Sequence, residues 1–213
     1  EASEAPVCEL FCLSSRLATT ATFSLQTFAR RGGLRGAIDG WGLASYDGRD
    51  VRLYSIENSH TGEWQRFQPV GETDFEVAFC ILLERLASVW GPGLVPSVDA
   101  RLAIVASFAT DMRKLGPANF LYSDGDVLFV HGHRRTQQNG TIAPPGLWCL
   151  SRRCPAESDE LSQAGIVIES PDQAQEVLLF ASVPLTDEGW RPLTEGEVVV
   201  AKDGRVLKGP SSL

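Results

Sequence analysis

Two helical patterns in direct succession, with strand-like runs before and after them, most constrain how this chain can fold. In residues 75–90 apolar side chains recur at helical spacing, namely Val77, Ala78, Ile81, Leu82, Leu86 and Val89. Gly91-Pro92-Gly93 then breaks the chain, and Ser97 predicts the N-cap of a second helix that reaches about Lys114. A helix pair among strands predicts an α+β arrangement of layers.

The start of the first helix also carries a charge of interest. Thr73 and Glu76 have the spacing of a capping box, in which each side chain accepts a hydrogen bond from a free backbone N–H. Asp74 between them would be held rigidly. Its carboxylate either stabilises the helix dipole, a contribution of about 0.3 to 1 kcal/mol, or holds a cationic ligand.

Most of the remaining chain has the pattern of short strands. A short helix over residues 22–30 ends at Gly32-Gly33, and hairpin turns are expected at Asp47-Gly48 and Asp124-Gly125. The expected strands are residues 7–13, 42–46, 51–55, 119–123, 127–131, 146–151, 166–168, 177–183, 198–201 and 205–207. Residues 134–145 and 152–165 are expected to be surface loops. The prediction is a single domain over residues 8–213, preceded by an extension of residues 1–7.

Composition excludes several function classes. The 213 residues carry a net charge of −8 and a sequence pI near 4.9, which disfavours nucleic acids and anionic membranes as partners. No apolar run approaches the ~20 residues that span a bilayer, and residues 1–10 lack the features of a signal peptide. A small-molecule substrate and a cytoplasmic location are therefore expected.

The five cysteines are odd in number and widely spaced, so reduced thiols are expected. A zinc site built from the close pairs Cys8/Cys12 and Cys149/Cys154 is the alternative. It is disfavoured because residues four apart in a strand stand about 13 Å apart. Cys80, inside the first helical pattern, is expected to be a small core residue.

Several segments in order carry a family likeness: Cys8-Glu9-Leu10-Phe11, Arg31-Gly32-Gly33, residues 39–44, residues 69–76, residues 128–134, residues 181–190 and residues 195–206. In these segments the chain resembles the class II glutamine amidotransferases, specifically their compact stand-alone branch. The resemblance implies the four-layer αββα sandwich of the N-terminal nucleophile hydrolases. It also implies glutamine as substrate, no cofactor and no metal.

The resemblance further assigns roles to residues. Cys8 matches the family's nucleophile, whose thiolate attacks the side-chain amide of glutamine while its own α-amino group moves the protons. Asp74 would pair with the α-ammonium of the substrate, within the segment that also contains Gly71 and Thr73. Trp41 and Gly42 would lie beside the nucleophile, although Trp41 could equally be a core residue.

Two histidines near the end of an expected strand have two interpretations. His131 and His133 could neighbour the active site by their position before Arg134-Arg135. Structural or solvent-facing roles are the commoner alternative.

Two departures from the family pattern bear on activity. Residues 1–7 precede Cys8, so its nitrogen is an amide and cannot act as a base unless this stretch, a propeptide or an artificial remnant, is removed. Between Ser55 and Pro69 the chain is also too short for the family's substrate-binding arginine and its His-Asn-Gly turn, which forms the oxyanion hole. The hypothesis is that Ser55 to Ile56 marks an internal omission.

Three functions remain open on this basis. The first is a glutamine amidohydrolase that supplies ammonia to a separate synthase. The second is a hydrolase of a γ-glutamyl amide in a small-molecule pathway. The third is a degenerate member of the family that keeps the fold for binding.

Overall fold

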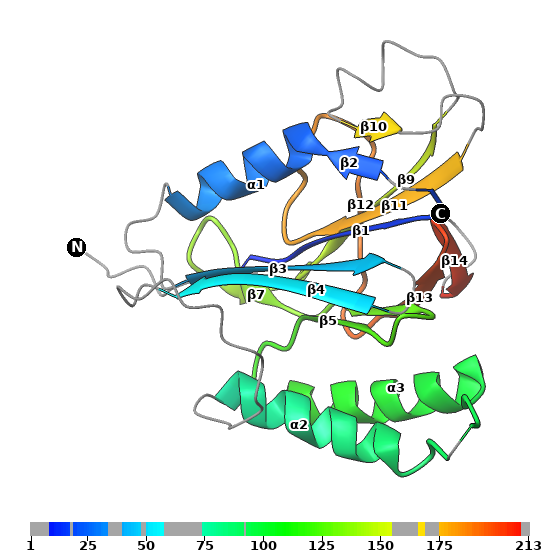
Figure 1. Ribbon diagram of the computed structural model, residues 1–213. Helices are drawn as coiled ribbons and strands as arrows, with labels where there is room; N and C mark the ends of the chain where they lie inside the picture. The colour runs from blue at the N-terminus through cyan, green and yellow to red at the C-terminus, as the bar shows by residue number, and fades with distance from the viewer. Residues whose placement is uncertain are drawn as a thin grey trace. The chain divides into compact units, whose positions relative to one another are not determined.

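The chain divides into two units. The computed structural model describes residues 9–17, 19–33, 40–47, 50–57, 74–91, 93–154, 166–168 and 175–209. The first unit consists of residues 1–37 and 117–213, and the second consists of residues 38–116. Strands dominate the described part of the first unit, whereas the described part of the second contains one hairpin and two helices (Figure 1).

One four-stranded antiparallel sheet of the first unit has the order β1-β11-β9-β12. Its strands are β1 (Phe11–Ser15), β11 (Gln175–Ala181), β9 (Trp148–Cys154) and β12 (Arg191–Pro192). In Figure 1 the orange β11 lies between β1, which is blue, and β9, which is yellow-green. The register aligns Cys12, Phe180 and Cys149 in one row across three strands.

A second four-stranded antiparallel sheet has the order β14-β13-β6-β5. Its strands are β14 (Arg205–Lys208), β13 (Val198–Lys202), β6 (Leu128–His131) and β5 (Phe120–Ser123). Two tight turns close its hairpins, and both use backbone conformations that favour glycine. Gly125 has a φ of 83°, and Asp203 and Gly204 have φ values of 53° and 77°.

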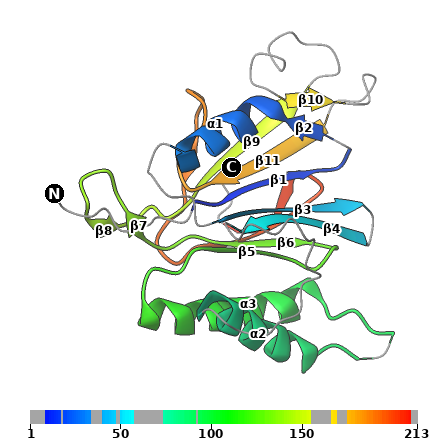
Figure 2. The ribbon, with the colours of Figure 1, turned by 60° about the vertical axis from the view of Figure 1, so that its left-hand side comes forward.

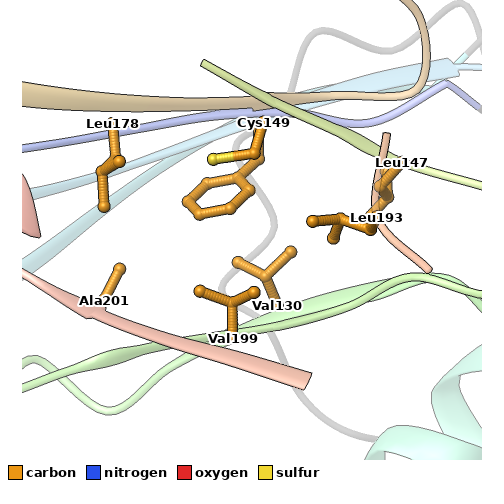
Figure 3. Close-up of a cluster of buried hydrophobic side chains, with 8 residues drawn as sticks. Val130, Leu147, Cys149, Leu178, Leu193, Val199 and Ala201 are labelled. Carbon is orange, nitrogen blue, oxygen red and sulfur yellow. The ribbon is translucent and has the colours of Figure 1, made fainter. Parts of the chain in front are cut away.

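The two sheets pack face to face over an apolar core. Leu178 and Cys149 point from the first sheet toward Val130, Val199 and Ala201 of the second (Figure 3). Burying an apolar side chain of Leu or Val size contributes about 1.5 to 3 kcal/mol. These contacts therefore stabilise the stacking of the two sheets.

Helix α1 (Thr22–Gly33) covers the other face of the first sheet (Figure 2). Its Phe28 packs against a second group of buried apolar side chains, which includes Leu150, Val177 and Leu179 of the first sheet. The Phe28 ring lies 5.8 Å from that of Phe11. Among the residues of the first unit that the structure describes, α1 and the two sheets thus form three layers. Two smaller ladders pair β2 (Thr19–Ala21) with β10 (Ile166–Ile168), and β7 (Arg135–Thr136) with β8 (Ile142–Ala143).

The second unit begins with a hairpin of β3 (Gly40–Asp47) and β4 (Asp50–Glu57). Asp47 faces Asp50 across the two strands, which confirms the hairpin expected at this point. Helix α2 (Asp74–Ala87) and helix α3 (Val98–Leu115) follow. The Ser97 side chain accepts a hydrogen bond from the backbone N–H of Ala100 at 3.2 Å, as a cap requires.

The two helices contact each other through polar and apolar side chains. Arg85 of α2 donates to Asp111 of α3 at 3.0 Å and lies over the ring of Phe108 at 5.8 Å. Leu82 and Leu86 on α2, and Val105 and Phe108 on α3, are buried. None of the helices in the described ranges is long and apolar enough to cross a membrane.

The mixture of sheets and helices confirms an α and β protein, but one predicted loop is wrong. Residues 134–145 contain the β7–β8 hairpin, and the side chain of Arg135 within it is only 8% exposed. Its guanidinium is buried because it binds the carbonyl of Ser182, which follows β11, and the carboxylate of Glu9, which precedes β1. Residues 7 and 8 of the first expected strand lie outside the described residues, and β1 begins at Phe11.

Candidate active site

The predicted site residues fall in both units. Cys8, Gly71 and Thr73 lie outside the described residues. Trp41 and Gly42 belong to β3, and Asp74 is the first residue of α2. That these residues come together in one site therefore stays a prediction.

Glu9, the covalent neighbour of Cys8, is held by two arginines. Its carboxylate accepts hydrogen bonds from Arg31 Nε at 3.0 and 3.2 Å and from Arg31 Nη2 at 3.1 Å. A further contact joins it to Arg135 Nη2 at 3.5 Å. The Glu9 and Arg135 side chains are 11% and 8% exposed, whereas that of Arg31 is 28% exposed, so Arg135 meets the carboxylate on its buried side and Arg31 on its more exposed side.

Leu10, the next residue, is held through its backbone. Its N–H donates to Ser182 Oγ at 2.8 Å, and its carbonyl accepts from the Ser182 N–H at 3.0 Å. Arg135 Nη1 donates to the Ser182 carbonyl at 2.6 Å. Arg135 thus links the backbone partner of Leu10 to the side chain of Glu9.

The local sequence explains why Arg31 meets Glu9. Side chains three apart on a helix share a face, as Phe28 and Arg31 do, and side chains two apart on an extended chain also share a face, as Glu9 and Phe11 do. The Phe28–Phe11 ring contact therefore places Arg31 over Glu9. One apolar contact and one ion pair align α1 with the start of β1.

The two histidines have structural contacts. His133 Nδ1 accepts a hydrogen bond from the backbone N–H of Ala118 at 3.3 Å, which leaves Nε2 to carry the proton that faces Glu195 at 3.3 Å. The hydrogen bond from Arg134 is the largest of the effects that hold the pKa of Glu195 below its ordinary value. His131 is fully buried, with its ring 5.0 Å from that of Phe120. These contacts favour the structural interpretation of both histidines.

Two of the cysteines are poor nucleophiles in the folded protein. Burial raises the pKa of the Cys12 thiol to about 12, and burial also raises that of Cys149 to about 12. They lie two strands apart in one row, roughly 9.5 Å by the usual strand spacing, which is too far for a disulfide. Among the described residues no group of three or more acidic, cysteine or histidine side chains could hold a metal ion.

Sequence reasoning missed the contacts around Glu9. Glu9 and Arg31 belong to segments that carry the family likeness, but nothing in the sequence pairs them. Arg135 lies in a stretch expected to be a loop, and Ser182 follows β11. The sequence signal for these contacts is Glu9 itself, a charged residue next to the candidate nucleophile Cys8.

The comparisons with known proteins agree on one family. The family model for class II glutamine amidotransferases matches residues 7–63 and 55–212. "Putative glutamine amidotransferase YafJ" of Escherichia coli (strain K12) is 26% identical over 256 aligned positions, covering 90% of this chain and 96% of the relative. A Haemophilus influenzae relative with the same family name is 22% identical, covering 94% of this chain and 86% of that one.

A solved structure gives the same result. The crystal structure of a "predicted glutamine amidotransferase" from Pseudomonas aeruginosa PA01 matches with a TM-score of 0.64 and 25% identity. The match covers 94% of this chain and 100% of that one.

The family match is divided in two. Its two stretches, residues 7–63 and 55–212, overlap at residues 55–63. The alignment with the Escherichia coli relative has 256 positions, whereas this chain has 213 residues, so the relative contains residues with no counterpart here.

Proposed function

Because the chain belongs to the class II glutamine amidotransferases, we propose that it releases ammonia from glutamine through a thioester on Cys8. The observation that carries this proposal is the family match, which begins at residue 7 and so includes Cys8. Cys149 is buried and Cys12 is partly buried, and burial raises the pKa of both thiols, so neither competes with Cys8 for the role of nucleophile.

The proposed reaction has two steps. The Cys8 sulfur attacks the side-chain carbonyl carbon of glutamine, and the α-amino group takes the thiol proton and passes it to the departing ammonia. The thioester then reacts with water to give glutamate and the free thiol. An α-amino group has a pKa of about 7.7 to 8, which suits a proton carrier near neutral pH. This role requires Cys8 to be the amino-terminal residue.

The substrate-binding groups are proposed from the family motif. Asp74, the first residue of α2, pairs with the α-ammonium of glutamine through a charge-assisted hydrogen bond. Thr73 and Gly71 shape the same segment, and Trp41 and Gly42 of β3 line the site. The helix start supports this assignment because it fixes the backbone from which the Asp74 carboxylate extends.

The four-layer αββα sandwich of the N-terminal nucleophile hydrolases is proposed for the whole chain. Its support within the first unit is the stack of α1 and two sheets. The second unit contains the helix pair, α2 and α3, that such a fold requires for its fourth layer.

We also propose an internal omission near Ser55 to Ile56. Two observations support it: the family match is divided into two stretches that overlap at residues 55–63, and the Escherichia coli relative contains residues with no counterpart here. Losing one oxyanion-hole donor costs roughly 100- to 1,000-fold in rate, so a chain without this segment would be nearly inert and would keep only a binding role. A peptide map with one continuous junction from Tyr54 to Glu57 would refute the omission.

The test of the proposed function is ammonia release from glutamine by protein that begins at Cys8. Cys8→Ala should abolish release, and the chain that begins at Glu1 should be inactive for want of the amine. Release by Cys8→Ala at the wild-type rate would refute the mechanism. Replacing glutamine with γ-glutamyl amides in the same assay distinguishes the second function from the first.

Asp74→Asn tests the substrate assignment. Loss of the carboxylate should raise KM for glutamine roughly 10- to 100-fold, in line with a hydrogen bond to a charged group. Asp99→Asn is the matched control, because Asp99 lies in the first turn of the neighbouring helix α3. Equal KM values for the two variants would show that Asp74 serves only its helix.

A further inference from the structure

We propose that Glu9, Arg31, Arg135 and Ser182 form a clamp that positions Cys8 for reaction and sets the charge around it. The inference rests on the proposed function and assigns these four residues positioning roles. Glu9 is the central residue, since its backbone is bonded to Cys8 and its side chain contacts both arginines.

The clamp fixes the backbone that enters residue 8. The Cα atoms of consecutive residues are about 3.8 Å apart, so the freedom of Cys8 is limited by how firmly Glu9 and Leu10 are held. The Leu10 backbone has hydrogen bonds with both the backbone and the side chain of Ser182, and Glu9 has contacts from α1 and from β7. Three separate parts of the first unit therefore hold the two residues that follow the nucleophile.

The clamp also sets a local charge. Within the described residues, the charged groups that contact Glu9 are Arg31 from α1 and Arg135 from β7. Two guanidinium groups and one carboxylate leave one net positive charge beside residue 8. A positive charge favours a thiolate over a thiol and a neutral amine over an ammonium. The excess arginine thus favours the reactive form of both Cys8 groups.

A purely structural ion-pair cluster would behave differently. It would stabilise the packing of α1 on β1, and its loss would lower thermal stability without changing how Cys8 titrates. Two substitutions with opposite effects on charge separate these roles. Glu9→Gln adds one net positive charge, whereas Arg31→Gln removes one.

The experiment measures the rate at which iodoacetamide alkylates Cys8 as a function of pH, with the Cys8 peptide quantified by mass spectrometry. Glu9→Gln should move the midpoint of this pH profile about half a pH unit lower, and Arg31→Gln should move it about half a unit higher, as expected for a change of one nearby charge under partial screening. Glu176→Gln is the matched control. It removes a carboxylate that pairs with Arg205 at the opposite end of β11.

Kinetics with glutamine provide the second readout. In protein that begins at Cys8, Glu9→Gln should lower kcat roughly 10-fold or more and leave KM within about 3-fold, because the nucleophile rather than the substrate is misplaced. Glu176→Gln should leave both constants unchanged. A Glu9→Gln variant with control-like kcat and control-like titration overturns the clamp.

The two proposals fail in different ways. If the wild-type protein releases no ammonia, the proposed function fails, and the alkylation midpoints still test the clamp. If ammonia is released but both midpoints equal that of the control, the clamp fails alone. Should Glu9→Gln not fold, the upward shift with Arg31→Gln remains the deciding measurement, and its absence overturns the proposal.

Discussion

Glu197 offers the sharpest test of how this fold is stabilised. Its carboxylate, 4% exposed, accepts hydrogen bonds from Arg191 at 2.8 and 3.1 Å. It also accepts the backbone N–H of Thr194 at 2.8 Å and the Thr194 hydroxyl at 2.9 Å. The Glu197 carbonyl receives the Gly132 N–H at 3.0 Å. One carboxylate therefore organises the turn that leads into β13.

Replacing Glu197 with Gln should lower the free energy of unfolding by about 2 to 3 kcal/mol at pH 7. The glutamine side chain has the shape of glutamate, but its amide N–H₂ group would face the N–H and O–H donors of Arg191 and Thr194. At least one hydrogen bond to the charged carboxylate is therefore lost, and a hydrogen bond to a charged group is worth about 1.5 to 3 kcal/mol. Burial would raise the pKa of Glu197, but the hydrogen bonds from Arg191 and Thr194 outweigh it and hold the pKa below its ordinary value.

This direction fixes the pH dependence. A carboxyl group with a lowered pKa in the folded state stabilises the protein fully above its unfolded pKa of about 4.3. The contribution is lost as the pH falls through the lower folded value. The difference between wild type and Glu197→Gln should therefore be largest near pH 7 and shrink below about pH 4.

Urea titrations at pH 7 and pH 3.5, followed by circular dichroism, measure both free energies. Glu176→Gln is the control, because its partly exposed pair with Arg205 should contribute less than about 1 kcal/mol. A loss for Glu197→Gln that is the same at the two pH values would refute the reasoning, since the stabilisation would then not come from the charged carboxylate.

Two further predictions follow from backbone and thiol geometry. Gly204→Ala should lower the free energy of unfolding by at least about 2 kcal/mol in urea or thermal unfolding, because φ is positive and a methyl group would overlap the carbonyl oxygen of Glu176. Gly125→Ala should cost only about 1 kcal/mol, because φ is also positive there but the space around the residue is open. Equal losses for the two variants would contradict the steric argument. Cys12 and Cys149 should react slowly with thiol reagents at pH 8 until the protein unfolds, and rapid labelling of either in native protein would contradict the raised pKa of that thiol.

Local signals in the sequence predicted the elements that depend on local interactions. The cap at Ser97 and the turn at Gly125 are confirmed because a side-chain oxygen and a positive φ each act within a few residues. The likeness to the amidotransferases, spread over ordered segments, is confirmed by the family match.

The clamp around Glu9 could not be predicted in the same way. Arg135 and Glu9 are far apart in the chain, and their contact depends on how β7 and β1 come together. A polar stretch such as residues 134–145 resembles a loop in sequence even when one of its arginines is buried. That Cys8 and Asp74 share one site also depends on tertiary structure, and this prediction rests on the family motif.

The most direct test of the central claim, that Cys8 is the nucleophile of a glutamine amidohydrolase, uses an electrophilic glutamine analogue such as a diazoketone. Protein that begins at Cys8 is incubated with the analogue, with and without excess glutamine, and the modified residue is located by peptide mass spectrometry. One adduct is expected, on Cys8, and excess glutamine should prevent it. An adduct on another cysteine, or labelling of Cys8 that glutamine does not slow, would contradict it.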